Sequence, residues 1–209
     1  MPLESLHADA HCIVVCKPSG LLAVPGRGEA GRDCLSERVR SKYADALIVH
    51  RLDMATSGLM LLARGTEAQR TLSIAFARRE VHKRYVAIVA GRMASAEGEI
   101  ELPLSADWPN RPRQQVDKLR GRPSLTRYRV LDVDAANAST RVELEPVTGR
   151  AHQLRVHLLA IGHPILGDAL YAGPDVQAAA PRLLLHASSL RFAHPASGEP
   201  MSFDSPPPF

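Results

Sequence analysis

One polar stretch between two apolar runs constrains this chain more than any other feature. Residues 50–58, HRLDMATSG, follow the apolar run 46–49 and precede the apolar run 59–63. Folded cores expel charge unless it is paired, so the polar stretch is expected to be a loop held between buried strands. An Asp beside an Arg is costly to place there, which makes Asp53 a functional candidate. Asp53 could equally be a turn residue that caps backbone N–H groups, and the residues alone leave both interpretations open.

Length and composition bound the class of protein. The chain has 209 residues, of which 45 % are hydrophobic, enough for one large domain or two small ones with a real core. No apolar run is long enough to span a membrane, and the run 12–16 is too short and too late for a signal peptide. Three cysteines argue against a disulfide framework. These features predict a cytoplasmic protein in a reducing setting, with no membrane partner.

The charge balance permits nucleic-acid binding without proving it. Lys and Arg number 26 against 22 acidic residues, and the sequence pI is about 9.2. Aromatic residues make up 4 % of the chain, which argues against stacking of many bases along a single strand.

The first half of the chain predicts a hairpin and a helix separated by a loop. Residues 3–16 are expected to form two strands with a turn near residues 9–10. The glycine-rich stretch 25–32 lacks the order of a phosphate-binding loop. Asp33 is expected to cap a helix that runs to about Tyr43.

A buried strand, a helix and a second strand are expected next. The continuous apolar run 59–63 predicts the buried strand. Thr66 and Gln69 have capping-box spacing, so a helix should begin there and end at residues 78–79. The alternation over 82–91 predicts the second strand.

The second half predicts two more strands and one helix. Strands are expected near 124–133 and 139–145. Thr148 is expected to start the helix, which Gly162 ends. His152 and His157 have the wrong spacing for a two-histidine zinc helix, so they are interpreted as core or hydrogen-bonding residues.

Residues 105–124 form a basic stretch with few apolar residues. Two acidic residues, Asp107 and Asp117, oppose its basic ones. The basic residues are Arg111, Arg113, Lys118, Arg120 and Arg122. A long charged loop is usually solvated surface, but beside an RNA site it would serve as a phosphate clamp. Both interpretations stay open.

The polar stretch 50–58 resembles the HRLDxxTSG motif of the RluA family of RNA pseudouridine synthases. The resemblance implies that Asp53 is the catalytic residue that isomerises uridine. It also implies that Arg51 fills the gap left by a flipped-out base, and that His50 and Thr56 contact the substrate.

Two further motifs extend the resemblance. Residues 83–91 are similar to the family's KxYxAxVxG motif, which implies that Tyr85 stacks on the target uracil and takes the proton from C5, while Lys83 lines the pocket. Residues 146–157 are similar to PxTGRxHQLRxH, which implies that Arg155 pairs with the catalytic Asp and that Leu154 contacts the substrate.

Other segments continue the resemblance from about residue 10 to the end. The segment 162–171 matches the family, with Asp168 expected to be a structural residue that caps a turn. Residues 107–112, DWPNRP, are similar to one branch of the family, which acts on two RNAs. The implied targets are stem-loops carrying position 746 of 23S rRNA and position 32 of the tRNA anticodon loop.

The resemblance implies an α+β fold, with a mixed, mostly antiparallel sheet flanked by helices. It implies one catalytic domain over residues 1–209, with no separate N-terminal RNA-binding domain. Uridine isomerisation adds and removes no atoms overall, so no cofactor and no metal is expected. The expected partner is RNA, and the chain is expected to be a monomer with no obligate protein partner.

Two rival functions follow from the same residues. A serine hydrolase could use Ser57 with one of nine histidines, but Thr56-Ser57-Gly58 has no nucleophile-elbow pattern. A non-catalytic RNA-binding module could use the same basic surface, but it would gain nothing from the carboxylate of Asp53. A uridine-isomerisation assay separates all three functions.

Overall fold

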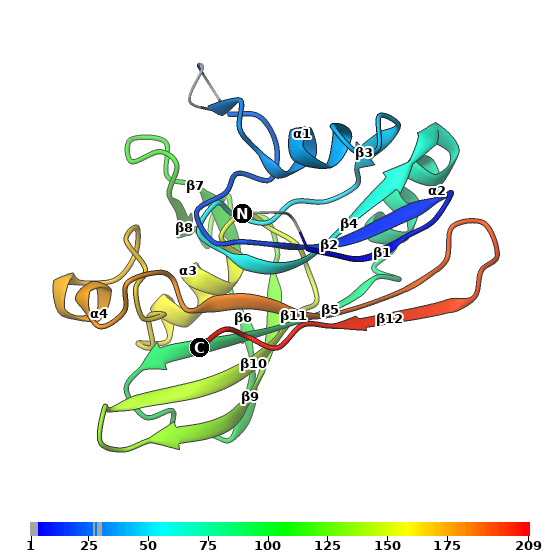
Figure 1. The fold of residues 1–209 in the computed structure, drawn as a ribbon. Helices are drawn as coiled ribbons and strands as arrows, with labels where there is room; N and C mark the ends of the chain where they lie inside the picture. Colours follow the sequence, from blue (N-terminus) through cyan, green and yellow to red (C-terminus); the bar gives the residue numbers. More distant parts are fainter. Residues whose placement is uncertain (1–3, 27, 29–30) are drawn as a thin grey trace. The chain divides into compact units, whose positions relative to one another are not determined.

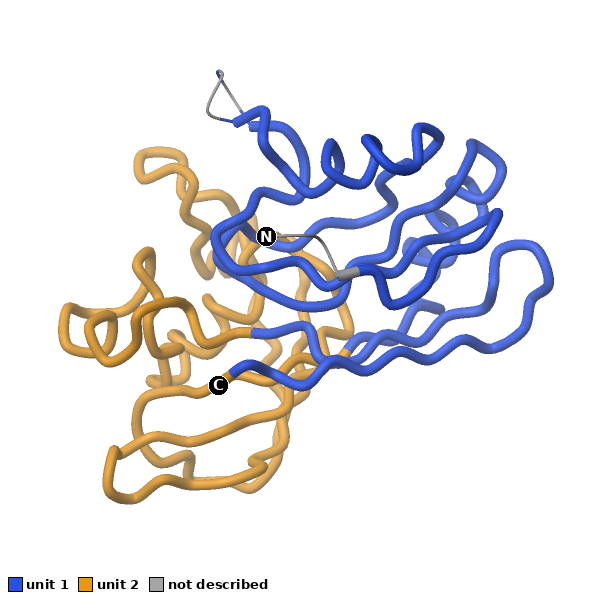
Figure 2. The backbone as a smooth tube through the Cα atoms, viewed as in Figure 1, with its two compact units in different colours: residues 1–83, 186–208 blue, residues 84–185, 209 orange. Residues whose placement is uncertain are grey.

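The computed structural model describes residues 4–26, 28 and 31–209. These residues form two compact units (Figure 2). Unit 1 comprises residues 1–83 and 186–208, and unit 2 comprises residues 84–185 and 209. Unit 1 is therefore built from two segments that are far apart in the sequence.

The sheet of unit 1 has the strand order β1-β2-β4-β11 (Figure 1). Its strands are β1 (Glu4–Ala8), β2 (Cys12–Lys17), β4 (Ser57–Arg64) and β11 (Leu185–Ala193), with β3 (Ala46–Ile48) paired to β4 and β12 (Pro200–Asp204) paired to β11. The first residue of β11 belongs to unit 2. β4 and β11 run parallel, whereas β1–β2, β2–β4, β3–β4 and β11–β12 are antiparallel. The predicted hairpin and the buried strand after the polar loop are confirmed, although residue 3 lies outside the described residues.

Apolar side chains of β2, β4, β11 and α2 (Gly65–Ala77) pack into the core of unit 1. The fully buried members include Cys12, Val14, Leu61 and Leu72. Every residue of β4 from 57 to 63 is buried, because the strand lies between two neighbours and its apolar run covers both faces. The glycine-rich stretch 25–32 falls partly outside the described residues, at 27, 29 and 30.

Two predicted helix starts in unit 1 are wrong. The helix α1 (Leu35–Arg40) begins after Cys34, and Asp33 instead forms an ion pair with Arg38, 2.7 Å between charged atoms. The helix α2 begins at Gly65, whose φ of +74° suits glycine. Gln69 does not complete a capping box, because its side-chain amide donates to the Ile48 carbonyl at 3.0 Å.

The sheet of unit 2 is antiparallel, with the order β5-β10-β9-β6 (Figure 1). Its strands are β5 (His82–Ala90), β10 (Ser139–Pro146), β9 (Leu125–Asp134) and β6 (Glu97–Glu101), and the first two residues of β5 belong to unit 1. The three strands predicted in this region are confirmed. Val142 and Leu144 of β10 are buried completely at the centre of this sheet.

The predicted helix start at Thr148 is also wrong. The helix α3 (Gln153–Ala160) begins five residues later. The Thr148 hydroxyl is engaged elsewhere, because it accepts from the Leu125 N–H at 3.0 Å and donates to the Gln153 side chain at 2.8 Å. A shorter helix, α4 (Pro174–Ala178), follows.

The basic stretch is not one long loop. It contains a two-stranded hairpin of β7 (Leu104–Ala106) and β8 (Gln114–Val116). The polar sequence of β8, Gln-Gln-Val, gave no alternation from which to predict a strand.

The fold class is α+β, with a mixed, mostly antiparallel strand arrangement and few helices, as predicted. Among the described residues, no helix is both long enough and apolar enough to cross a membrane.

Candidate active site

The loop 50–58 bends sharply at Asp53. The Thr56 N–H donates to the Asp53 carbonyl at 3.1 Å, which closes a turn across Met54 and Ala55. Asp53 is half-buried, Arg51 is exposed and Thr56 is buried. The candidate carboxylate therefore stands on a tight turn at the head of β4, next to an arginine that faces solvent.

The turn after β2 holds this loop from one side. The Lys17 ammonium, which is fully buried, donates to three carbonyls: two in its own turn, at 2.9 and 2.7 Å, and that of Met54 at 3.0 Å. The Gly20 N–H donates to the same Met54 carbonyl at 2.9 Å, and the Ser19 hydroxyl donates to the Ala55 carbonyl at 2.7 Å. We call residues 17–20 the loop clamp. The role of Lys17 was not predicted from the sequence, although a lysine at the end of a buried strand was a signal.

The other end of the loop is fixed to β11. Gly58 has φ +114°, and a Cβ there would lie 2.3 Å from the Ala187 carbonyl oxygen. Only glycine allows this approach of β4 to β11. The buried Ser57 hydroxyl and His186 Nδ1 are 2.8 Å apart. This serine–histidine contact is the geometry that the serine-hydrolase rival needs, but both residues are at most 3 % exposed, so it is a structural contact.

His50 fixes the start of the loop to β4 and α2. Its Nε2 accepts from the Leu61 N–H at 2.9 Å, and its ring stacks on Phe76 with 4.6 Å between centroids. Burial, together with the nearby charge of Lys83, lowers the pKa of His50 to about 3. Burial also lowers the pKa of Lys83, whose ammonium lies 5.6 Å from the Phe76 centroid. His50 is therefore a neutral acceptor for β4 at neutral pH, and its contact with substrate stays a prediction.

In unit 2, Arg155 forms a buried ion pair with Asp168. The two bonds are 2.8 Å from Nε to Oδ2 and 2.6 Å from Nη2 to Oδ1, and the side chains are 4 % and 1 % exposed. Oδ1 of Asp168 also accepts from the N–H groups of Leu170 and Tyr171, so the predicted turn cap is confirmed. The ion pair itself was not predicted, although two opposite charges within apolar runs pointed to it.

The two histidines of α3 and its cap make hydrogen bonds, as predicted. His152 Nδ1 lies 2.6 Å from the Tyr171 hydroxyl, and His157 Nδ1 lies 2.9 Å from the Thr126 hydroxyl. Burial lowers the pKa of His157. Leu154 is buried, and Tyr85 is half-buried on β5.

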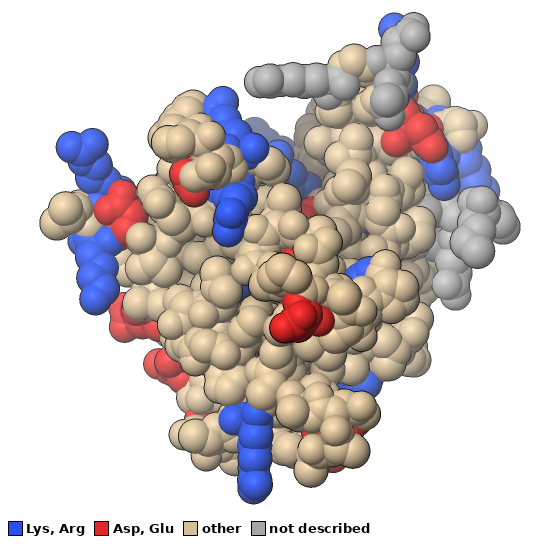
Figure 3. All heavy atoms as spheres, turned by 90° about the vertical axis from the view of Figure 1, so that its left-hand side faces the viewer, with Lys and Arg blue, Asp and Glu red and all other residues tan. Residues whose placement is uncertain are grey.

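The two arginines predicted to bind RNA lie at the β7–β8 hairpin in different settings. The guanidinium carbon of Arg111 is 3.4 Å from the centroid of the exposed Trp108 ring. That of Arg113 is 5.4 Å from the buried Tyr171 ring. Figure 3 shows Lys and Arg side chains standing out from a surface that is mostly uncharged on this face.

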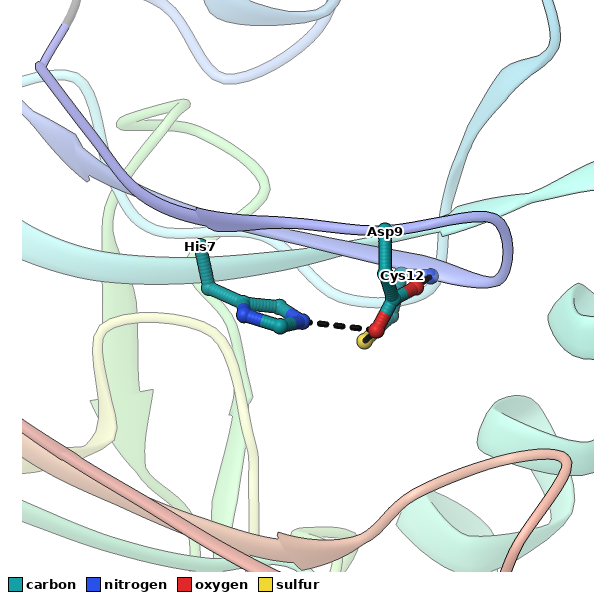
Figure 4. A group of neighbouring side chains, drawn as sticks. All are labelled: His7, Asp9 and Cys12. Carbon is teal, nitrogen blue, oxygen red and sulfur yellow. Dashed lines mark hydrogen bonds and ion pairs between the residues drawn. The ribbon is translucent and has the colours of Figure 1, made fainter.

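A second polar cluster lies at the β1–β2 turn (Figure 4). One atom each of His7, Asp9 and Cys12 lies within 4.8 Å of the others, a spacing that a metal ion could use. Hydrogen bonds account for the arrangement, because Asp9 Oδ2 lies 2.7 Å from His7 Nε2 and 3.1 Å from His194 Nε2. Burial and the Asp9 charge raise the pKa of the Cys12 thiol to about 12, which disfavours the thiolate that a metal needs. The cluster therefore fixes the turn.

The predicted site residues are divided between the units. Unit 1 contains His50, Arg51, Asp53, Thr56 and Lys83, and unit 2 contains Tyr85, Arg111, Arg113, Leu154 and Arg155. The contacts above bring Asp53 together with the loop clamp, and Arg155 together with Asp168. The expected pairing of Arg155 with Asp53 stays a prediction.

Comparison with known proteins identifies the family. A family model described as RNA pseudouridylate synthase matches residues 11–160, more than half of the chain. The chain belongs to this family. The synthase is thus an isomerase that converts uridine to pseudouridine in RNA.

The relatives of the synthase cover nearly all of it. It is 52 % identical over 207 residues to the dual-specificity RNA pseudouridine synthase RluA of Escherichia coli (strain K12), covering 99 % of this chain and 94 % of that protein. The protein of the same name from Pasteurella multocida (strain Pm70) is 50 % identical with the same coverage. Among solved structures, human RNA pseudouridylate synthase domain containing 1 matches with TM-score 0.82 and 28 % identity, covering 99 % of this chain and 84 % of that one.

Proposed function

We propose that this synthase isomerises single uridines in stem-loops of both tRNA and 23S rRNA, with Asp53 as the catalytic carboxylate. The observation that carries the dual specificity is the 52 % identity, over 99 % of the chain, to relatives whose name states it. The segment 107–112 supports the same branch of the family. The proposed targets are position 32 of the tRNA anticodon loop and position 746 of 23S rRNA.

The reaction assigns Asp53 its task. The N1–C1′ bond breaks, the uracil rotates, and a C5–C1′ bond forms while the C5 proton leaves and N1 gains a proton. An ionised carboxylate can attack C1′ as a nucleophile or remove a proton from C2′ as a base. The clamped turn suits either route, because bonds to the carbonyls of Met54 and Ala55 hold the backbone that carries the half-buried Asp53.

The other site residues take roles around the flipped uridine. Extrusion of a base costs a few kcal/mol, and the exposed Arg51 is suited to occupy the vacated position because a guanidinium can stack and donate at once. Tyr85 stacks on the uracil and takes the C5 proton, and Lys83 lines the pocket. His50, Thr56 and Leu154 shape the walls of the substrate site.

Arg155 is proposed to favour the ionised form of Asp53 in addition to holding Asp168. A guanidinium carries five N–H donors and can bind more than one acceptor group. We also propose that Arg111 and Arg113 contact RNA phosphates, that the chain works as a monomeric single catalytic domain, and that it does so in the cytoplasm. Its three cysteines are free, which suits that compartment.

The catalytic assignment is tested by Asp53→Asn, which keeps the shape and removes the charge. Release of tritium from RNA labelled at C5 of uridine should fall to background while RNA binding persists. Asp33→Asn is the matched control, because that carboxylate is 65 % exposed in a surface ion pair and should not affect turnover. Near-normal turnover by the Asp53 variant would contradict the assignment.

The substrate assignment is tested by giving the enzyme each minimal hairpin alone. An anticodon stem-loop and an rRNA hairpin should each gain one pseudouridine, because a small domain with nine aromatic residues must recognise shape and phosphates more than many bases. Modification of one RNA only would exclude dual specificity and leave the synthase activity intact.

A further inference from the structure

The tip of the β7–β8 hairpin exposes the chain's single tryptophan. Trp108 is 68 % exposed, which is unusual for the largest apolar side chain. A single exposed apolar side chain is common and marks no site by itself. Trp108 is not alone, because the Arg111 guanidinium lies against one face of its ring at 3.4 Å from the centroid.

Backbone and side-chain bonds hold this tip in shape. The Asn110 N–H donates to the Asp107 carbonyl at 3.1 Å, and the Arg113 N–H donates to the Asn110 carbonyl at 3.0 Å. The Asn110 amide also donates to both carboxylate oxygens of Asp107, at 3.1 and 3.0 Å. Where the tip meets β8, the Gln114 N–H donates to the Tyr171 hydroxyl at 2.8 Å. The Trp108–Arg111 pair thus stands on an ordered support.

The acidic groups of the hairpin are turned toward local N–H donors. Asp107 accepts from Asn110, and Asp117 accepts from the N–H groups of Arg120 and Leu119, which hold the pKa of Asp117 below its usual value. The basic side chains Arg111, Lys118 and Arg120 are exposed. Arg111 stands at the tip with Trp108, whereas Lys118 and Arg120 follow β8 at the other end of the hairpin. The tip therefore offers an aromatic ring beside one exposed guanidinium.

We propose that Trp108 and Arg111 form a stacking platform for one unpaired base of the RNA hairpin, a contact beyond the phosphate clamp. The proposal rests on the proposed RNA substrate. Aromatic rings and planar guanidinium groups are the surfaces on which unstacked RNA bases lie. A phosphate clamp alone would need Arg111 but would gain nothing from an exposed tryptophan, so the pairing of the two side chains favours a base.

The experiment uses the fluorescence of Trp108, which no second tryptophan obscures. The full chain is titrated with an anticodon stem-loop, with a fully paired duplex of the same stem, and with inorganic polyphosphate. Stacking should quench Trp108 with the stem-loop and leave the emission nearly unchanged with duplex or polyphosphate. Equal quenching by polyphosphate would overturn the platform.

Variants separate the platform from the rest of the hairpin. Trp108→Ala should weaken stem-loop binding by roughly 5- to 150-fold, the range for loss of one stacked base, whereas Trp108→Phe should retain most of the affinity. Leu119→Ala is the matched control, because Leu119 is 95 % exposed in the turn that follows β8, and this variant should bind normally. Melting temperatures check that each variant is folded.

The failures of the two proposals are distinguishable. If the stem-loop is bound and modified by the Trp108→Ala variant at the wild-type level, the platform is wrong and the function stands. If the wild-type enzyme neither binds nor modifies stem-loops, the proposed substrate is wrong and the platform is wrong with it.

Discussion

Two buried cations, one in each unit, are stabilised in different ways. Lys17 in unit 1 donates to three backbone carbonyls, whereas Arg155 in unit 2 forms a two-bond ion pair with Asp168. An ammonium is a compact charge with donors in three directions, so it can collect carbonyls from separate turns. A guanidinium is planar, and two of its N–H groups can donate in parallel to the two oxygens of one carboxylate.

The two cations connect different parts of the chain. Lys17 reaches the Met54 carbonyl, 37 residues away, and so joins the loop clamp to the loop of Asp53. Asp168 lies 13 residues from Arg155 and joins α3 to the turn that follows it. Lys17 therefore shapes the loop of Asp53 directly, whereas the ion pair of Arg155 stabilises its own unit.

The largest expected effect comes from breaking the ion pair. Arg155→Met leaves Asp168 buried without its cation, which should lower the free energy of unfolding by about 3–5 kcal/mol. Denaturant unfolding measures this loss. The double variant with Asp168→Leu should recover much of it, because no buried charge then remains unpaired. A single variant as stable as the wild type would show that the pair contributes nothing.

A somewhat smaller loss is expected at Lys17. Lys17→Met removes the donor for two turn carbonyls, while Met54 keeps the bond from Gly20, so the free energy of unfolding should fall by about 2–4 kcal/mol. Turnover below the melting temperature should fall further than stability predicts, because the loop of Asp53 loosens. Lys42→Met, an exposed lysine, is the control. Normal turnover in the folded Lys17 variant would separate the clamp from catalysis.

The smallest effect is expected at Asp9, an anion held largely by N–H donors. Burial raises its pKa, but bonds from the N–H groups of Cys12 and His11, with those of two histidines, outweigh burial and hold the pKa well below 3.8. Asp9 thus adds stability above the unfolded pKa, and this contribution is lost as the pH falls from about 4 through the folded pKa. Asp9→Asn should cost about 1–2 kcal/mol at pH 7. The difference in melting temperature between the wild type and the Asp9→Asn variant should become smaller below pH 4. A difference that stays constant with pH would exclude this linkage.

Strands were predictable wherever a local apolar pattern was strong. The runs 12–16 and 59–63 and the alternation over 82–91 matched β2, β4 and β5 closely. Helix starts were not predictable in this way, because α1 and α2 begin without any side-chain cap. Asp33 and Gln69 carry the residue types of a cap but bond to other partners.

The site was predictable as a set of motifs but not as a set of contacts. The resemblance to the family's motifs singled out Asp53 and Arg155, and it could not show that Lys17 holds the loop or that Asp168 holds Arg155. Such pairings depend on tertiary folding that brings distant segments together. Gly58 is a further case, since the need for glycine comes from β11, more than a hundred residues later.

The discontinuity of unit 1 has a consequence for synthesis of the chain. β4 pairs with β11 and β11 pairs with β12, so this sheet lacks two of its strands until residues 185–204 have left the ribosome. Unit 2 is continuous over residues 84–185, so nearly all of it is made before β11. At about 5–20 residues per second, β4, which is complete at Arg64, then waits roughly 6 to 24 seconds for its partners His186 and Ala187, with that part of its edge unpaired. During that interval the nascent chain offers chaperones a binding segment at the strand that follows Asp53.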